Sequence, residues 1–100
     1  MPHIKNILVI GSGTMGHGIA QSFAMGGFEV AMQDSFPQAL DRADKLIKGS
    51  LATMVEAGLI AKNDIPNILG RIHPTDSLEV AAKDADLAIE CIVENKTPWG

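Results

Sequence analysis

Residues 6–34 decide the fold and read NILVI GSGTMG HGIAQSFAMGG FEVAMQD. The run Ile-Leu-Val-Ile after Asn6 is apolar and mostly β-branched, which is typical of a strand buried on both faces of a parallel sheet. A glycine-rich turn follows, and then apolar residues at helical spacing as far as Gly26 and Gly27, which we expect to end the helix. Residues 28–33 have the pattern of a second strand. Together these segments predict a βαβ unit with a right-handed crossover.

The remaining residues predict a long helical crossover and two further strands. We expect a helix from an N-cap at Ser35 to about Glu56, which at about 1.5 Å per residue is about 30 Å long and projects beyond a small sheet. A short helix over residues 63–69, capped by Asn63, should fold back against it. A weak strand over 71–73, a brief helix over 77–83 and a strand over 86–93 complete the pattern.

The predicted fold class is therefore α/β, a Rossmann-type doubly wound parallel sheet with a projecting helical hairpin. Such sheets normally have six strands, and residues 1–100 provide only four. We therefore expect the chain to be a single dinucleotide-binding domain that is incomplete after its fourth strand.

Composition excludes several classes of protein. Of the 100 residues, 46% are hydrophobic and 20% are charged, as in a globular domain and unlike a disordered chain. The net charge of −4 and the absence of a Lys/Arg cluster argue against binding to nucleic acid or to an anionic membrane. The single cysteine, Cys91, rules out an internal disulfide and a CxxC zinc site, and we expect no metal. Without a membrane-spanning run or signal-peptide pattern, the expected location is cytoplasmic.

The glycine-rich turn carries the first functional signal. Gly11-x-Gly13-x-x-Gly16 follows a buried strand directly and opens a helix, which is the context of a dinucleotide-binding loop. Gly11 permits the tight turn, Gly13 lets the backbone approach a pyrophosphate, and Gly16 lets the helix pack closely on the strand. The helix N-terminus offers N–H groups and a partial positive charge to the phosphates. A GK[ST] ending is absent, which argues against a P-loop.

Asp34 indicates which dinucleotide binds. It ends the second predicted strand, where a carboxylate accepts hydrogen bonds from the adenosine ribose hydroxyls and repels a 2′-phosphate. The residues that follow, Ser35 to Pro37, are neutral and offer no cation to such a phosphate. We therefore predict NAD(H) as the cofactor in preference to NADP(H).

No catalytic residue can be assigned from the remaining side chains. The histidines, none of which has an acid at catalytic spacing in the sequence, are His3, His17 and His73. Glu90 and Glu94 bracket the carboxyl end of the last predicted strand, the edge at which open α/β sheets bind ligands. Of these two, Glu94 is the candidate for a functional role.

The sequence also resembles the amino-terminal part of the L-3-hydroxyacyl-CoA dehydrogenases. The resemblance covers about residues 4–95 and is carried by the string VIGSGTMGHGIAQ over residues 9–21, by Asp34, and by segments 85–90 and 93–95. It implies an NAD-dependent oxidoreductase that converts an L-3-hydroxyacyl-CoA to a 3-oxoacyl-CoA in fatty-acid β-oxidation or butanoate metabolism. The NAD-binding residues that it implies are Gly11, Ser12, Gly13, Thr14, Met15, Gly16, Asp34 and, near the nicotinamide, Glu94.

The same resemblance implies that Ser50 contacts the coenzyme A part of an acyl-CoA substrate. Ser50 lies at the edge of the apolar face of the long predicted helix. Because that helix is longer than the sheet requires, we expect its far end to reach over the cleft, where a hydroxyl group can meet coenzyme A.

The chain departs from the family pattern in two respects. Family members carry a lysine a few residues after the position of Glu94, where this chain has Lys96 nearby and Trp99 five positions on. The family's catalytic histidine, its partner glutamate, the assisting serine and asparagine, and the helical domain that forms the homodimer all lie beyond residue 100. The chain alone is therefore predicted to be inactive.

Two alternative functions stay open at this stage. One is a stand-alone NAD(H)-binding module without catalysis. The other is a related dehydrogenase that acts on hydroxy acids or sugar nucleotides, although the long hairpin over residues 37–69 argues against it, because those enzymes usually have a short crossover there.

Overall fold

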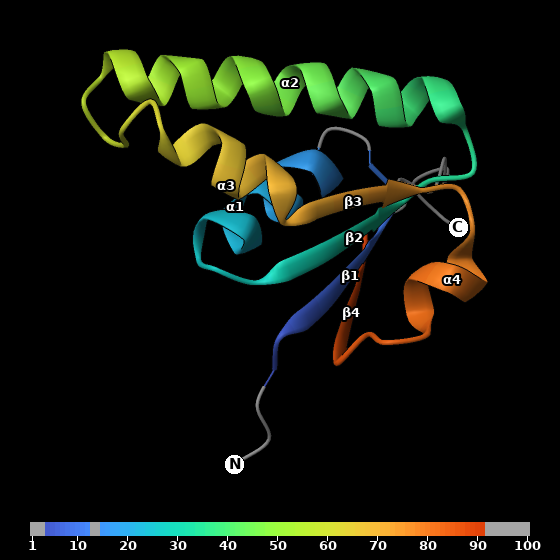
Figure 1. Cartoon of the computed structure of the whole chain (residues 1–100). Helices are drawn as coiled ribbons and strands as arrows, with labels where there is room; N and C mark the ends of the chain where they lie inside the picture. Colours follow the sequence, from blue (N-terminus) through green and yellow to red (C-terminus); the bar gives the residue numbers. More distant parts are fainter. Residues whose placement is uncertain (1–3, 13–14, 92–100) are drawn as a thin grey trace, which may run out of the picture.

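Across residues 4–12 and 15–91, which the computed structural model describes, four parallel strands form one sheet in the order β3-β2-β1-β4 (Figure 1). The strands are β1 (Asn6–Ile10), β2 (Glu29–Gln33), β3 (Ile72–Thr75) and β4 (Leu87–Glu90). The chain winds outward from β1 to β3 and then returns to place β4 on the other side of β1. This order is that of a doubly wound sheet, as predicted.

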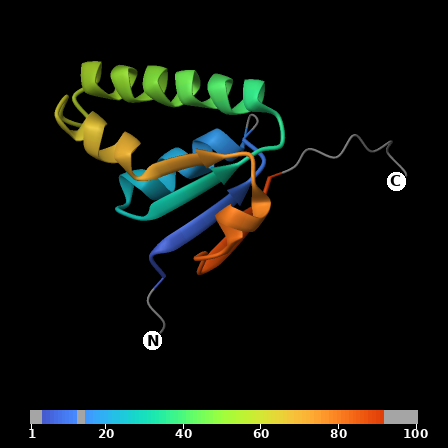
Figure 2. The ribbon, with the colours of Figure 1, turned by 45° about the vertical axis from the view of Figure 1, so that its right-hand side comes forward.

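The helices cover the two faces of the sheet unequally. α1 (Gly16–Met25), α2 (Pro37–Glu56) and α3 (Asp64–Gly70) lie on one face, and α4 (Leu78–Ala82) lies on the other (Figures 1 and 2). Right-handed crossovers produce this division, because the chain reverses its direction across the sheet after β3. The main core lies under the first three helices and consists of Ile7, Val9, Ala20, Ala24, Val30, Met32, Ala43, Ile47, Leu51 and Ile68.

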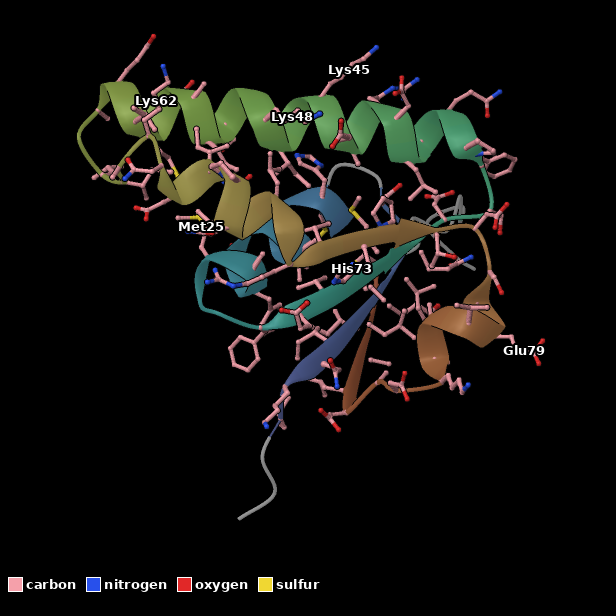
Figure 3. The ribbon with its side chains drawn as sticks, in the orientation of Figure 1. Met25, Lys45, Lys48, Lys62, His73 and Glu79 are labelled. Atoms are coloured by element: carbon pink, nitrogen blue, oxygen red, sulfur yellow. The ribbon has the colours of Figure 1, made fainter. Side chains whose placement is uncertain are left out.

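The helical hairpin is confirmed. α2 has 20 residues, and α3 folds back along it (Figure 2). On the outer side of α2, charged pairs link successive turns, with Lys45 3.3 Å from Asp41 and Lys48 2.8 Å from Asp44. Lys45 points away from the sheet (Figure 3). α2 therefore packs its apolar side on the core and turns its charged side to solvent.

The predicted start of α2 was wrong. The helix begins at Pro37, with Phe36 as its N-cap, and not after Ser35. The side chain of Asp34 is the reason, because its Oδ1 accepts a hydrogen bond of 3.0 Å from the Phe36 N–H and forms a turn before the helix. Pro37 then occupies the first helical position, where proline is favoured.

Two predicted strand boundaries also differ from the structure. β3 runs to Thr75 and not to residue 73, because its pairing with β2 continues as far as Gln33. β4 ends at Glu90, although the Cys91 N–H still donates to the Ile10 carbonyl oxygen at 2.7 Å. The rest of the predicted strand, residues 92–93, lies outside the described residues.

No helix in the described part of the chain is both long enough and apolar enough to cross a membrane.

Candidate functional site

The candidate site is built at the carboxyl ends of β1 and β2. Gly11 follows β1, and its N–H donates to the carbonyl oxygen of Gln33 at 2.7 Å, so the two strands stay paired up to the turn. Gly11 has a φ of +92°, a conformation that costs glycine little and other residues much more. The chain can therefore turn sharply out of the sheet at this point, as predicted for Gly11.

Gly16 brings the start of α1 against the end of β1. A Cβ atom at Gly16 would overlap the carbonyl oxygen of Gly11 and would lie 2.8 Å from its carbonyl carbon. Only a residue without a side chain fits there without movement of the backbone. The close packing of helix and strand predicted from Gly16 is thus present.

The N-terminus of α1 has no side-chain cap from its N-cap residue. Met15 is the N-cap and makes no side-chain capping hydrogen bond, and the first turn contains no acidic residue. The positive end of the helix dipole is therefore not neutralised by a side chain of the helix itself. Gly13 and Thr14, the other predicted members of this loop, lie outside the described residues.

Ser12 and Asp34 form the polar centre of the site. Ser12 is 1% exposed, and both its N–H and its hydroxyl donate to Oδ2 of Asp34 at 2.9 Å. The Phe36 N–H donates to Oδ1, so both carboxylate oxygens are held by the protein. This arrangement joins the glycine loop after β1 to the acid after β2.

The environment of Asp34 favours its ionised form. Burial is the largest single influence and raises the pKa of the Asp34 carboxyl. The hydrogen bonds from the Ser12 N–H, the Phe36 N–H and the Ser12 hydroxyl together outweigh it and hold the pKa below its usual value of 3.8. Asp34 is therefore a negative charge of fixed position at neutral pH.

This geometry fits a dinucleotide without a 2′-phosphate. A carboxylate offers about four acceptor positions, and three hydrogen bonds from the protein occupy part of that capacity. What remains can accept hydrogen bonds from ribose hydroxyls, whereas a phosphate would meet like charge.

Within residues 4–12 and 15–91, no group of three or more acidic, histidine or cysteine side chains is arranged to hold a metal ion.

Ser50 lies elsewhere, between α2 and α1. Its Oγ accepts a hydrogen bond of 3.0 Å from Nε2 of Gln21, and the next residue, Leu51, is completely buried. At Ser50 the helix still packs on the core, so the sequence-based argument that the helix overhangs the cleft here was wrong. Ser50 itself is half-buried. Its contact with coenzyme A stays a prediction.

His73 has a partner that the sequence did not reveal. His73 lies on β3 (Figure 3), and its Nε2 lies 2.9 Å from Oε1 of Glu29 on the neighbouring strand β2. Both side chains are exposed. Glu29 begins β2, about 16 Å along the strand from Asp34 at about 3.3 Å per residue, so this pair lies apart from the candidate site. Glu90 is exposed at the end of β4, and Glu94 lies outside the described residues.

Comparison with known proteins identifies the family. Residues 6–98 match the family model described as 3-hydroxyacyl-CoA dehydrogenase, NAD binding domain. Proteins described as probable 3-hydroxybutyryl-CoA dehydrogenases from Bacillus subtilis and Deinococcus radiodurans are 41% identical over 92 residues and 46% identical over 89 residues. These alignments cover 92% and 88% of this chain. The crystal structure of (S)-3-hydroxybutyryl-CoA dehydrogenase from Ralstonia eutropha superposes on 94% of this chain, with a TM-score of 0.88 and 31% identity.

These relatives are longer than this chain. The chain spans 32% and 31% of the two curated relatives and 33% of the solved structure. The matched region nevertheless includes the whole described sheet, the glycine loop and Asp34, and the family model names NAD as the ligand of this region. The chain therefore belongs to the 3-hydroxyacyl-CoA dehydrogenase family and corresponds to its NAD-binding domain.

Proposed function

We propose that the protein containing this chain oxidises an L-3-hydroxyacyl-CoA to a 3-oxoacyl-CoA, in fatty-acid β-oxidation or butanoate metabolism. The observation that carries the proposal is the Ser12–Asp34 arrangement beside the N-terminus of α1, in a chain that matches the family's NAD-binding domain over residues 6–98. When bound, NAD supplies a hydride acceptor. The residues of this chain hold and orient it.

The role proposed for each residue follows from its place in the fold. Gly11 and Gly16 shape the turn, and the first turn of α1, beginning after Met15, directs backbone N–H groups towards the pyrophosphate. Asp34 accepts the ribose hydroxyls, and Ser12 holds Asp34 in place. By resemblance to the family, Gly13 and Thr14 complete the phosphate loop and Glu94 contacts the nicotinamide end. These assignments are proposals for the complete protein.

We further propose that the base that removes the hydroxyl proton is not among the described residues. The His73–Glu29 pair is not that base in this proposal, because the pair begins about 16 Å along β2 from Asp34. A base must come within hydrogen-bond reach of its proton. The family resemblance places that base beyond residue 100, in the region that also forms the homodimer.

A cytoplasmic location is a further proposal, which the single cysteine supports.

Two measurements test this function. Calorimetric titration should give tighter binding of NAD than of NADP, because a 2′-phosphate would approach the fixed charge of Asp34. The natural gene product should oxidise 3-hydroxybutyryl-CoA with NAD, whereas residues 1–100 alone should show no turnover above a no-protein control. Equal or tighter binding of NADP would refute the assignment of Asp34.

The same assays separate the alternatives. A natural gene product that binds NAD but turns over no 3-hydroxyacyl-CoA would favour the stand-alone NAD(H)-binding module. Turnover of free hydroxy acids with no preference for the CoA thioester would favour the related dehydrogenase class. Turnover by residues 1–100 in a sample free of longer enzyme would show that a base is present within the chain.

A further inference from the structure

A buried amide connects α1 to α2 at a position that the cofactor site does not use. Gln21 of α1 is 6% exposed, and its Nε2 donates to Oγ of Ser50 at 3.0 Å. The same nitrogen lies 3.8 Å from the Sδ atoms of Met25 and Met54. Thioether sulfur is a weak acceptor, so the Ser50 hydroxyl is the strong acceptor in this contact.

The direction of this hydrogen bond determines what the Ser50 hydroxyl can do next. An amide nitrogen only donates, so Gln21 occupies a lone pair of the Ser50 oxygen and leaves its proton unused. A serine within a helix often gives that proton to the carbonyl of the preceding turn, as Thr53 of the same helix does with Gly49 at 3.1 Å. Within residues 4–12 and 15–91, the Ser50 hydroxyl makes no such bond. Its proton therefore has no acceptor among these residues, and Ser50 as a whole is only half-buried.

We propose that Gln21 is a positioning residue that fixes the Ser50 hydroxyl as a hydrogen-bond donor to an acceptor oxygen of coenzyme A. This inference rests on the proposed contact of Ser50 with the acyl-CoA substrate and specifies its polarity. Gln21 touches neither substrate nor cofactor in this proposal and acts only through Ser50. An apolar residue of similar size would fill the same space but would leave the hydroxyl free to turn inward, towards the Leu46 carbonyl oxygen of the preceding turn or another local acceptor.

The experiment compares the variants Gln21→Met and Ser50→Ala, singly and together, in the natural gene product. Methionine keeps the approximate volume of glutamine and removes the donor. Met54→Leu is the matched control, because it changes packing beside the same amide without removing the amide or the hydroxyl. The readouts are KM and kcat for 3-hydroxybutyryl-CoA and the dissociation constant for NAD.

We expect Gln21→Met and Ser50→Ala each to raise the KM for the acyl-CoA about two- to tenfold, the range for one neutral hydrogen bond. In the double variant, Gln21→Met should cause no further rise in KM beyond that of Ser50→Ala alone. NAD affinity and kcat should stay unchanged in all variants. Met54→Leu should leave KM unchanged.

Different failures overturn different steps. If Ser50→Ala leaves KM unchanged, Ser50 does not contact the substrate, and the role of Gln21 is overturned with it. If Ser50→Ala raises KM but Gln21→Met does not, the positioning role is overturned and the Ser50 contact stands. The same conclusion follows if Gln21→Met raises KM by the same factor whether residue 50 is serine or alanine. Loss of NAD affinity in Gln21→Met, or an equal rise in KM in Met54→Leu, would show that Gln21 acts only through packing.

Discussion

Gly16→Ala tests directly whether close packing between α1 and β1 maintains the cofactor loop. The new Cβ would overlap the carbonyl oxygen of Gly11, and the nearby atoms are backbone, which cannot rotate away as a side chain can. Either the start of α1 or the turn at Gly11 must move. Overpacking of this kind typically costs about 1–3 kcal/mol.

Gly18→Ala, two residues further along the same helix, is the matched control. A Cβ at Gly18 would meet no atom of the described residues within 4 Å outside the adjoining backbone of its own helix, so we expect the substitution to add no clash. Replacing a helical glycine by alanine then stabilises the protein by about 0.5–1 kcal/mol, because alanine loses less conformational freedom on folding. The two variants should thus differ in free energy of unfolding by roughly 1.5–4 kcal/mol, with Gly16→Ala the less stable.

Urea unfolding followed by circular dichroism measures this difference, and calorimetry measures NAD affinity in parallel. We expect Gly16→Ala to weaken NAD binding as well, because the movement falls on the loop between Gly11 and α1. The reasoning would be refuted if Gly16→Ala proved as stable as Gly18→Ala. A destabilised Gly16→Ala variant that kept full NAD affinity would refute only the link between this packing and the cofactor.

Two other predictions concern the same site. Gly13→Val should abolish NAD binding, because its side chain would fill the space proposed for the pyrophosphate, and should leave the free energy of unfolding within about 0.5 kcal/mol of that of the native chain. Calorimetry on a variant with native circular dichroism measures this, and retained NAD affinity would show that the loop has a structural role only. The pKa of Asp34 is lowered from 3.8, so its stabilising contribution is complete above that pH and is lost as pH falls through the lower folded value. Urea unfolding from pH 7 to about pH 3 should show this loss of stability in the native chain and a smaller loss in Asp34→Asn. Asp86, whose pKa is also lowered, should contribute to the loss that remains in Asp34→Asn.

The sequence was sufficient to predict the βαβ unit because its signals are local. The apolar run of β1, the glycine turn and the spacing of α1 lie within residues 6–25, and each signal agrees with the others. The positive φ of Gly11 and the absence of space at Gly16 follow from requirements that any such turn imposes. The order of the strands also follows, because right-handed crossovers leave few alternatives.

Side-chain contacts between distant elements could not be predicted in the same way. The Gln21–Ser50 and Glu29–His73 contacts join residues 29 and 44 positions apart, and each depends on how two elements are rotated against one another. The start of α2 was misplaced for a different, local reason. Ser35 is a favoured capping residue by type, but the Phe36 N–H donates to the Asp34 carboxylate two residues earlier, and Phe36 becomes the N-cap instead.

The Ser12–Asp34 contact changes how the glycine loop is understood. Resemblance to the family placed Ser12 among the cofactor-binding residues, yet its N–H and its hydroxyl both donate to Asp34. In the proposed function, phosphate recognition is then assigned to the rest of the loop and to the first turn of α1. Because Ser12 is buried and donates twice to Asp34, the protein itself orients the carboxylate and favours its ionised form. Groups held in advance need no reordering on binding, and this lowers the entropic cost of holding the ribose. The proposed discrimination against a 2′-phosphate would have the same origin, since a charge held at both oxygens cannot turn away from such a phosphate.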